Sequence, residues 1–154
     1  MDVQTLQKMV QEIVRKASEL KDWHTDVRDA PVNYACVFSH SLEEYDELVW
    51  AAEKMGKAVK ETPTGPLFLI GPLETVAGEL RLLKIRLPDE ERPERGDADF
   101  TVPDYGAFKA KYLPRAGFRL IEREGFEMIE LVDPKFDVRA YFSHPTLLEL
   151  LGIG

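Results

Sequence analysis

The feature that most constrains this sequence is a junction that occurs twice. Segment 55–61, Met-Gly-Lys-Ala-Val-Lys-Glu, resembles segment 116–122, Ala-Gly-Phe-Arg-Leu-Ile-Glu. In each copy the end of an expected helix is followed by a glycine and then by an expected strand. Similarity at a fixed offset, here about 60 residues, is typical of duplicated structural units. The sequence therefore predicts two similar modules; the alternative is that two short segments of an ordinary α+β protein agree by chance.

The first module is expected to contain a strand, a helix and three further strands. Ser41, with Glu44 three residues later, forms a capping-box pattern that begins the helix. Gly56 is expected to end it in a left-handed conformation. The predicted strands cover residues 32–38, 57–62, 66–71 and 80–87, and the helix runs to Met55.

The second module repeats this order after the charged, proline-containing connector 88–96, which is expected to be solvated and not to form a site. Asp104 caps a helix to about Ala116, and Gly117 follows it. The predicted strands cover residues 97–102, 118–122, 126–131 and 137–142.

Two helices flank the modules. Apolar residues at helical spacing predict an amphipathic helix over 1–24, whose apolar stripe docks either on the body of the protein or on a second subunit. A short helix is expected over 145–152, beginning at Pro145. The whole predicts an α+β fold in one domain, 1–154, in which modules 32–87 and 97–142 form a curved mixed sheet around a cleft. The stripe residues are Leu6, Met9, Val10, Ile13, Val14, Ala17 and Leu20.

Composition narrows the choice of partners. The net charge of −8 and the pI near 5.0 leave no basic stripe for phosphates, so we expect neither nucleic acid nor an anionic membrane as a partner. The longest apolar stretch, 66–73, is interrupted by glycine and proline. Cys36 is the only cysteine and has no intramolecular partner, which indicates a reducing, cytoplasmic location. No glycine-rich phosphate loop is present, so no nucleotide cofactor is expected.

Paired βαβββ modules of this length resemble the vicinal oxygen chelate superfamily of glyoxalases, extradiol dioxygenases and bleomycin-resistance proteins. Within it the sequence is similar to the metal-binding YecM-like branch, through Leu87-Pro88, Val102-Pro103 and His144-Pro145. The resemblance implies a cleft between two half-barrels, with ligands of a metal on the first and last strand of each module. It implies a small-molecule-binding protein, or a divalent-metal-dependent lyase, isomerase or dioxygenase acting on a small anionic metabolite.

The residues at those strand positions carry no histidine. Tyr34 and Cys36 lie on the first strand of module 1, and Glu79 and Arg81 on its last strand; module 2 offers Asp97 or Asp99, and then Asp137, Arg139 and Tyr141. Oxygen ligands of this kind suit a hard ion such as Mg²⁺ or Mn²⁺. The expected metal ligands are Asp99, Asp137 and Glu79, followed by His40 and His144, which lie at helix entries where two loops could meet.

The same strands suggest a binding site without a metal. Arg139 offers a planar set of donors for a carboxylate or phosphate, and Tyr141 adds a hydroxyl. The expected ligand-binding residues are Arg139, Tyr141, Asp99, Arg119, Tyr34 and Arg81. The alternatives are a structural ion pair between Arg139 and Asp99, and a structural protein that forms a homodimer through its N-terminal stripe. Cys36 is expected to be a buried and inert thiol.

Overall fold

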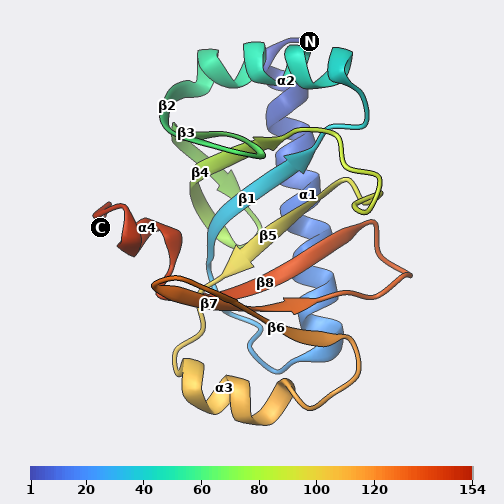
Figure 1. The fold of residues 1–154 in the computed structure, drawn as a ribbon, viewed down its shortest axis with the longest axis vertical. Coiled ribbons are helices and arrows are strands. Elements are labelled where there is room, and N and C mark those ends of the chain that lie inside the picture. The colour runs from blue at the N-terminus through green and yellow to red at the C-terminus, as the bar shows by residue number, and fades with distance from the viewer. Residues whose placement is uncertain (154) are drawn as a thin grey trace.

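The computed structural model describes residues 1–153 and contains the two predicted βαβββ modules. Helix α1 precedes them and helix α4 follows them (Figure 1). The prediction of the fold class is therefore confirmed. The elements are α1 (Val3–His24), β1 (Val32–Phe38), α2 (Leu42–Met55), β2 (Gly56–Thr62), β3 (Gly65–Thr75), β4 (Gly78–Arg86), β5 (Gly96–Phe100), α3 (Tyr105–Tyr112), β6 (Phe118–Arg123), β7 (Phe126–Leu131), β8 (Val138–His144) and α4 (Leu147–Leu150).

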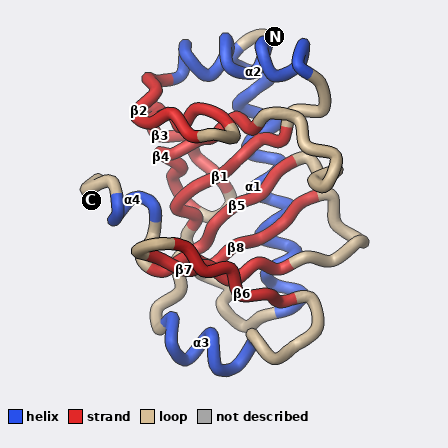
Figure 2. The backbone as a smooth tube through the Cα atoms, viewed as in Figure 1, coloured by secondary structure: helices blue, strands red, loops and turns tan. Residues whose placement is uncertain are grey.

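All eight strands form one sheet in the order β2-β3-β4-β1-β5-β8-β7-β6 (Figure 2). The first strand of each module pairs in parallel with the last strand of the same module. The two first strands, β1 and β5, then pair antiparallel at the centre of the sheet. This order is symmetric about the β1–β5 seam, as expected of two copies related by an approximate twofold rotation.

One glycine of the repeated junction differs from its prediction. Gly117 has a φ of +91°, in the left-handed region that favours glycine. Gly56 instead has an extended backbone and is the first residue of β2, so the prediction of a left-handed Gly56 is wrong. A Cβ at Gly56 would lie 2.0 Å from the carbonyl oxygen of Leu69 on β3. Gly56 is therefore required by the close approach of two strands.

The other differences between the predicted and the observed elements lie at the ends of helices. Ser41 caps α2 as predicted, by accepting a bond from the amide of Glu44, but the Glu44 carboxylate accepts from the amide of His40 instead of closing a capping box with Ser41. Helix α3 already ends at Tyr112, four residues earlier than predicted. Helix α4 begins after Thr146, whose hydroxyl caps it, and not at Pro145.

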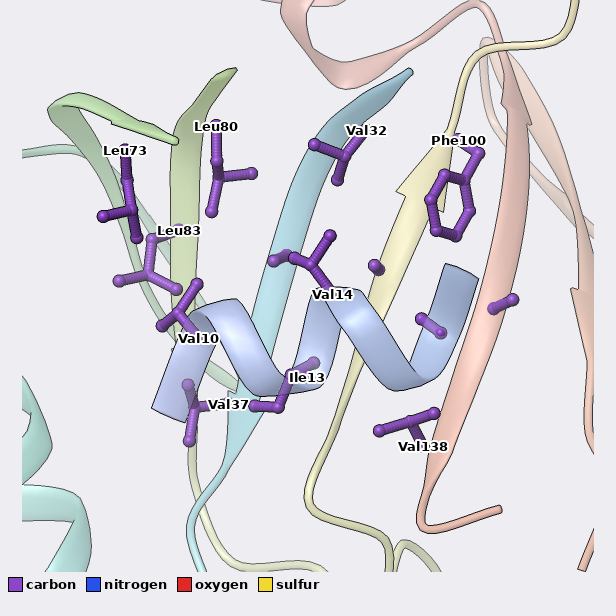
Figure 3. Packing of buried hydrophobic residues seen from close by; sticks show 14 of the residues in the cluster. Val10, Ile13, Val14, Val32, Val37, Leu73, Leu80, Leu83, Phe100 and Val138 are labelled. Atoms are coloured by element: carbon purple, nitrogen blue, oxygen red, sulfur yellow. The ribbon is translucent and has the colours of Figure 1, made fainter. Parts of the chain in front are cut away.

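Helix α1 supplies the centre of the core. It lies behind the sheet in Figure 1, and its stripe contacts the apolar face of the sheet around Val37, Leu83 and Val138 (Figure 3). Six of the seven stripe residues are at most 2% exposed, and Met9 packs against them half-buried. The stripe docks on the body of its own chain, so it is not a surface for a second subunit. No helix within residues 1–153 has the length and apolar character needed to cross a membrane.

A buried lysine closes the loop after α1. Lys21 is fully buried, and its Nζ atom donates to the carboxylate of Asp22 at 2.7 Å and to the carbonyls of Val27 at 2.9 Å and Arg28 at 3.1 Å. The ammonium group also lies 5.3 Å from the centre of the Phe100 ring. This one side chain therefore satisfies two carbonyls of a segment that has no regular structure.

We expect Lys21→Met to lower the free energy of unfolding by about 3 kcal/mol, because methionine keeps the apolar stem and leaves buried acceptors without a donor. Urea unfolding of the variant and of wild type measures the difference. Lys8→Met, at an exposed position on the same helix, is the matched control and is expected to change stability by less than about 0.5 kcal/mol. A loss below about 1 kcal/mol for Lys21→Met would contradict this role.

Candidate functional site

The face of the sheet turned away from α1, which we call the polar face, carries two rows of mostly polar side chains. Alternation along the central strands places Ala35, Ala98 and Ala140 in the core, so their sequence neighbours point to the opposite face. The strand register then sets two rows across the polar face. One row is Lys84, Cys36, Asp97 and Arg139; the next is Tyr34, Asp99, Tyr141 and Glu130.

Two buried carboxyl groups lie next to each other on β5. Asp97 is 6% exposed and Asp99 is 4% exposed. Burial raises the pKa of Asp97 to about 7 and that of Asp99 to about 6, because the charged form loses its hydration. Both groups therefore change protonation close to neutral pH.

The surroundings of these two carboxyl groups differ. Asp99 accepts from the side-chain amide of Asn33 at 3.0 Å, from the backbone amide of Ser143 at 3.2 Å and from the hydroxyl of Ser143. The Oδ1 atom of Asp97 is buried and has no hydrogen-bond partner within the described residues. Asp99 is thus held in a complete structural network, whereas Asp97 retains an unused acceptor.

Glu130 joins three of the predicted site residues. It accepts from the Tyr141 hydroxyl at 2.6 Å, and its carboxylate lies 3.2 Å from the Arg139 guanidinium and 3.1 Å from that of Arg119. Burial would raise the pKa of Glu130, but the Tyr141 hydroxyl and the two guanidinium groups outweigh it and hold the pKa below its usual value. The structure therefore brings Arg139, Tyr141 and Arg119 together, but around a carboxylate of the protein itself.

The connector between the modules lies over part of this face. Arg139 donates from Nη2 to the carbonyl of Glu91 at 3.0 Å, and its Nε lies 3.0 Å from the carboxylate of Glu94. Arg92 donates to the Tyr141 hydroxyl at 3.1 Å. The connector is thus attached to the sheet, and the expectation of a merely solvated loop is wrong. Arg139 pairs with Glu130 and Glu94, so the predicted ion pair with Asp99 does not form.

Three cations surround Asp97 without pairing with it. The charges of Arg92, Lys84 and Arg86 each act to lower its pKa, yet none of them lies within 4 Å of its carboxylate. Lys84 donates to the hydroxyl of Thr64, has no carboxylate within ion-pair distance among residues 1–153, and burial lowers its pKa. Arg86 and Arg92 share one carboxylate, that of Asp89, at 3.5 and 3.7 Å. Among the described residues, these three cations therefore have one carboxylate, that of Asp89, within ion-pair distance.

Two hollows open on either side of the connector turn at Pro88–Glu90. The first, of about 570 Å³, is lined by Ser39, His40 and Arg92 together with the turn. The second, of about 540 Å³, is lined by Thr64 and Arg86 and by the acidic residues Asp89, Glu90 and Glu91. Each adjoins a buried donor that has no partner within the described chain, the Oγ atom of Ser39 and the Nε atom of Arg86 respectively. These hollows give a solvent-borne ligand access to Arg92 and Arg86.

The carboxylates predicted to hold a metal do not meet. Asp99 is buried within its own network, whereas Asp137 is exposed before β8 and Glu79 is exposed at the start of β4. Among residues 1–153, no group of three or more His, Cys, Asp or Glu side chains is close enough to hold a metal ion. The remaining buried acid, Asp97, has cations as its neighbours, which disfavours a divalent cation there. The residues present therefore do not fit the metal that the resemblance implies.

The two histidines of the prediction lie at opposite ends of the central strands. His40 follows the end of β1, where its ring bonds to the Glu94 carbonyl at 3.0 Å and faces the guanidinium of Arg95 at 3.2 Å. His144 ends β8, and its ring stacks on Tyr105 with centroids 4.9 Å apart. Residues 37, 96 and 138 share one row of the sheet; His144 lies six residues from this row on β8, and His40 lies three residues from it in the opposite direction. The pair does not form one site.

The remaining residues that the sequence placed at the site, Tyr34, Cys36 and Arg81, lie outside the Glu130 network. Tyr34 lies on the polar face beside Asp99, and burial raises the pKa of its hydroxyl. Cys36 is buried, and burial likewise raises the pKa of its thiol, in agreement with the expectation of an inert cysteine. Arg81 is half-buried on β4, has no ion pair within residues 1–153, and lies outside the Glu130 network.

Sequence reasoning missed the cations Lys84, Arg86 and Arg92. Lys84 and Arg86 alternate with the core residues Leu83 and Ile85, so the period of the strand places them on the polar face. That signal was available in the sequence. No comparable signal exists for Arg92, because a loop residue has no period that fixes the direction of its side chain.

The comparisons with known proteins bear on the fold. No protein-family model matches the sequence, and no curated protein matches it. The solved structure of protein EC4020, a YecM protein, aligns with a TM-score of 0.74 at 12% identity, over 97% of this chain and 91% of that chain. A glyoxalase/bleomycin resistance protein/dioxygenase superfamily member from Vibrio splendidus 12B01 aligns with a TM-score of 0.45 at 10% identity, over 74% of this chain and 97% of that chain. The first match confirms the predicted YecM-like fold, and at this identity it shows the fold alone.

Proposed function

We propose that this protein binds a small anionic metabolite, without a metal, at the cations of the polar face beside the connector. The observation that carries the proposal is that Lys84, Arg86 and Arg92 have a single carboxylate, that of Asp89, within ion-pair distance among the described residues, and that Arg86 and Arg92 line two open hollows. A carboxylate or phosphate offers acceptors to several such donors at once. The buried hydroxyl of Ser39 supplies one more donor at the same place.

Arg92 is the principal binding residue in this proposal. It is half-buried, lines the first hollow, and already donates to the Tyr141 hydroxyl, so its guanidinium is positioned before a ligand arrives. Arg139, in contrast, is occupied by Glu130, Glu94 and the connector. The binding role expected of Arg139 is therefore better assigned to Arg92.

We expect inorganic phosphate or succinate to raise the melting temperature of wild type, and Arg92→Gln to weaken the binding of the same anion at least about tenfold. Glutamine keeps most of the stem and removes the charge. Calorimetric titration at constant ionic strength measures both affinities, with Arg123→Gln, an exposed arginine on the β6–β7 hairpin, as the matched control.

Two outcomes would contradict the proposal. One is the absence of stabilisation by any carboxylate or phosphate, and the other is equal binding by wild type and Arg92→Gln. A parallel titration with Mn²⁺, Ni²⁺ and Zn²⁺ tests the metal-dependent alternative. Anion binding that requires one of these ions would replace the metal-free proposal with the metal-dependent one.

A further inference from the structure

The first hollow, next to Arg92, carries charges of both signs. Among the described residues that line it, Arg92 is the single lysine or arginine, whereas Asp89 and Glu90 contribute two carboxylates. Asp89 has partners, since its carboxylate lies near Arg86 and Arg92 and accepts from the backbone amide of Glu91 at 2.9 Å. Glu90 is exposed, and its carboxylate makes no ion pair or hydrogen bond within residues 1–153. The hollow therefore has one unpaired negative charge besides its arginine.

The donors of this hollow are in place before a ligand arrives. Arg92 donates to the Tyr141 hydroxyl at 3.1 Å, and its guanidinium lies 5.8 Å from the centre of the Phe38 ring. Ser39 lines the same hollow, is 3% exposed, and has a hydroxyl without a hydrogen-bond partner in the described chain. Native proteins rarely leave such a buried group without a partner, so the hollow is suited to a ligand that brings an acceptor.

The two acids determine which anion fits. A ligand with negative charges alone is attracted by Arg92 but repelled by Asp89 and Glu90, which line the same hollow. Glu90 and Arg92 are two residues apart in the chain, so their backbones lie within about 7 Å of each other. An acid that carries an ammonium group a few bonds from its anionic group can therefore place each of its charges beside an opposite charge of the protein.

We propose that the ligand of this hollow is a zwitterion, an acid whose anionic group binds Arg92 and whose ammonium group lies beside Glu90. This inference rests on the proposed function and makes it more specific. It selects amino acids and similar ammonium-bearing acids over plain carboxylates and phosphates. An exposed charge pair contributes little, so Glu90 adjusts the choice among anions while Arg92 remains the main source of affinity.

Aspartate, succinate and malate provide the test, because they share two carboxylates and differ at one carbon in an ammonium group, a hydrogen or a hydroxyl. We expect aspartate to bind wild type at least about threefold more tightly than either of the others at low ionic strength, and added salt to reduce that ratio. Calorimetric competition at constant pH gives the ratios. Malate that binds as tightly as aspartate overturns the choice of an ammonium group, because a neutral hydroxyl then suffices.

The variant Glu90→Gln locates the effect, since glutamine keeps the shape of the side chain and removes its charge. We expect it to bind aspartate more weakly than wild type does and succinate more tightly, so that the aspartate-to-succinate ratio falls at least about twofold. Opposite changes for two ligands cannot result from a loss of folding. Glu124→Gln, exposed in the β6–β7 turn, is the matched control and is expected to keep the wild-type ratio. A ratio that Glu90→Gln leaves unchanged overturns the role of Glu90.

The outcomes separate the two proposals. Binding of succinate that Arg92→Gln weakens, together with equal affinity of wild type for aspartate and succinate, overturns the inference and leaves the proposed function intact. Failure of all three acids and of phosphate to bind wild type overturns the proposed function, and the inference with it.

Discussion

Asp97→Asn is expected to gain stability over wild type as the pH rises from 5 to 8, by about 2–3 kcal/mol across that interval. The pKa of Asp97 is about 7 in the folded chain and near 3.8, the ordinary value of an aspartate, when the chain is unfolded. Between these values the folded state binds the proton more tightly, so wild type becomes less stable as pH increases. The loss is complete above the folded pKa, and asparagine, which does not titrate, avoids it.

Urea unfolding of wild type and Asp97→Asn at pH 5, 6, 7 and 8 measures this effect. Any fixed cost of placing an amide in the site is the same at every pH and cancels in the comparison. Burial is the main cause of the raised pKa of Asp97; the cations Arg92, Lys84 and Arg86 lower it, and the charge of Asp99 raises it further. Asp29→Asn, at an exposed position, is the control. A stability difference that does not change with pH would show that Asp97 stays charged in the folded protein over the whole interval.

Arg139→Ala is expected to lower the free energy of unfolding by about 3 kcal/mol, because breaking a buried ion pair leaves its partner without compensation. The Arg139 side chain is 12% exposed, and it holds the 5% exposed carboxylate of Glu130 as well as Glu94 and the carbonyl of Glu91. We also expect a glutamate-specific protease to cleave the variant faster within the connector, after Glu90 or Glu91, because the attachment of that segment is lost.

Arg119→Ala is the matched control for this prediction. Arg119 pairs with the same Glu130 carboxylate from the outside, at 3.1 Å, but its side chain is 66% exposed. Exposed ion pairs contribute little, so a loss below about 1 kcal/mol and an unchanged cleavage rate are expected. Similar losses in the two variants would show that Arg139 has no special role in holding the connector.

The sequence predicted which residues share the polar face of the sheet, but it did not predict which side chains they contact. The period of two along the central strands predicted that Asp97, Asp99, Arg139 and Tyr141 share one face, and the structure confirms it. It did not predict their partners. Glu130 lies on another strand, and only the register between β7 and β8 places it opposite Tyr141.

The sequence alone determined the order of the elements, the two modules and the apolar stripe of α1, because these depend on local periods and on residues that begin or end helices. Only the tertiary structure decided which strand edges meet, that Gly56 is needed for a close approach, and that the connector lies on the polar face. The physical reason is that pairing and burial join residues far apart in the chain. The charge around Asp97 comes from β4, β5 and the connector, and no local pattern encodes their meeting.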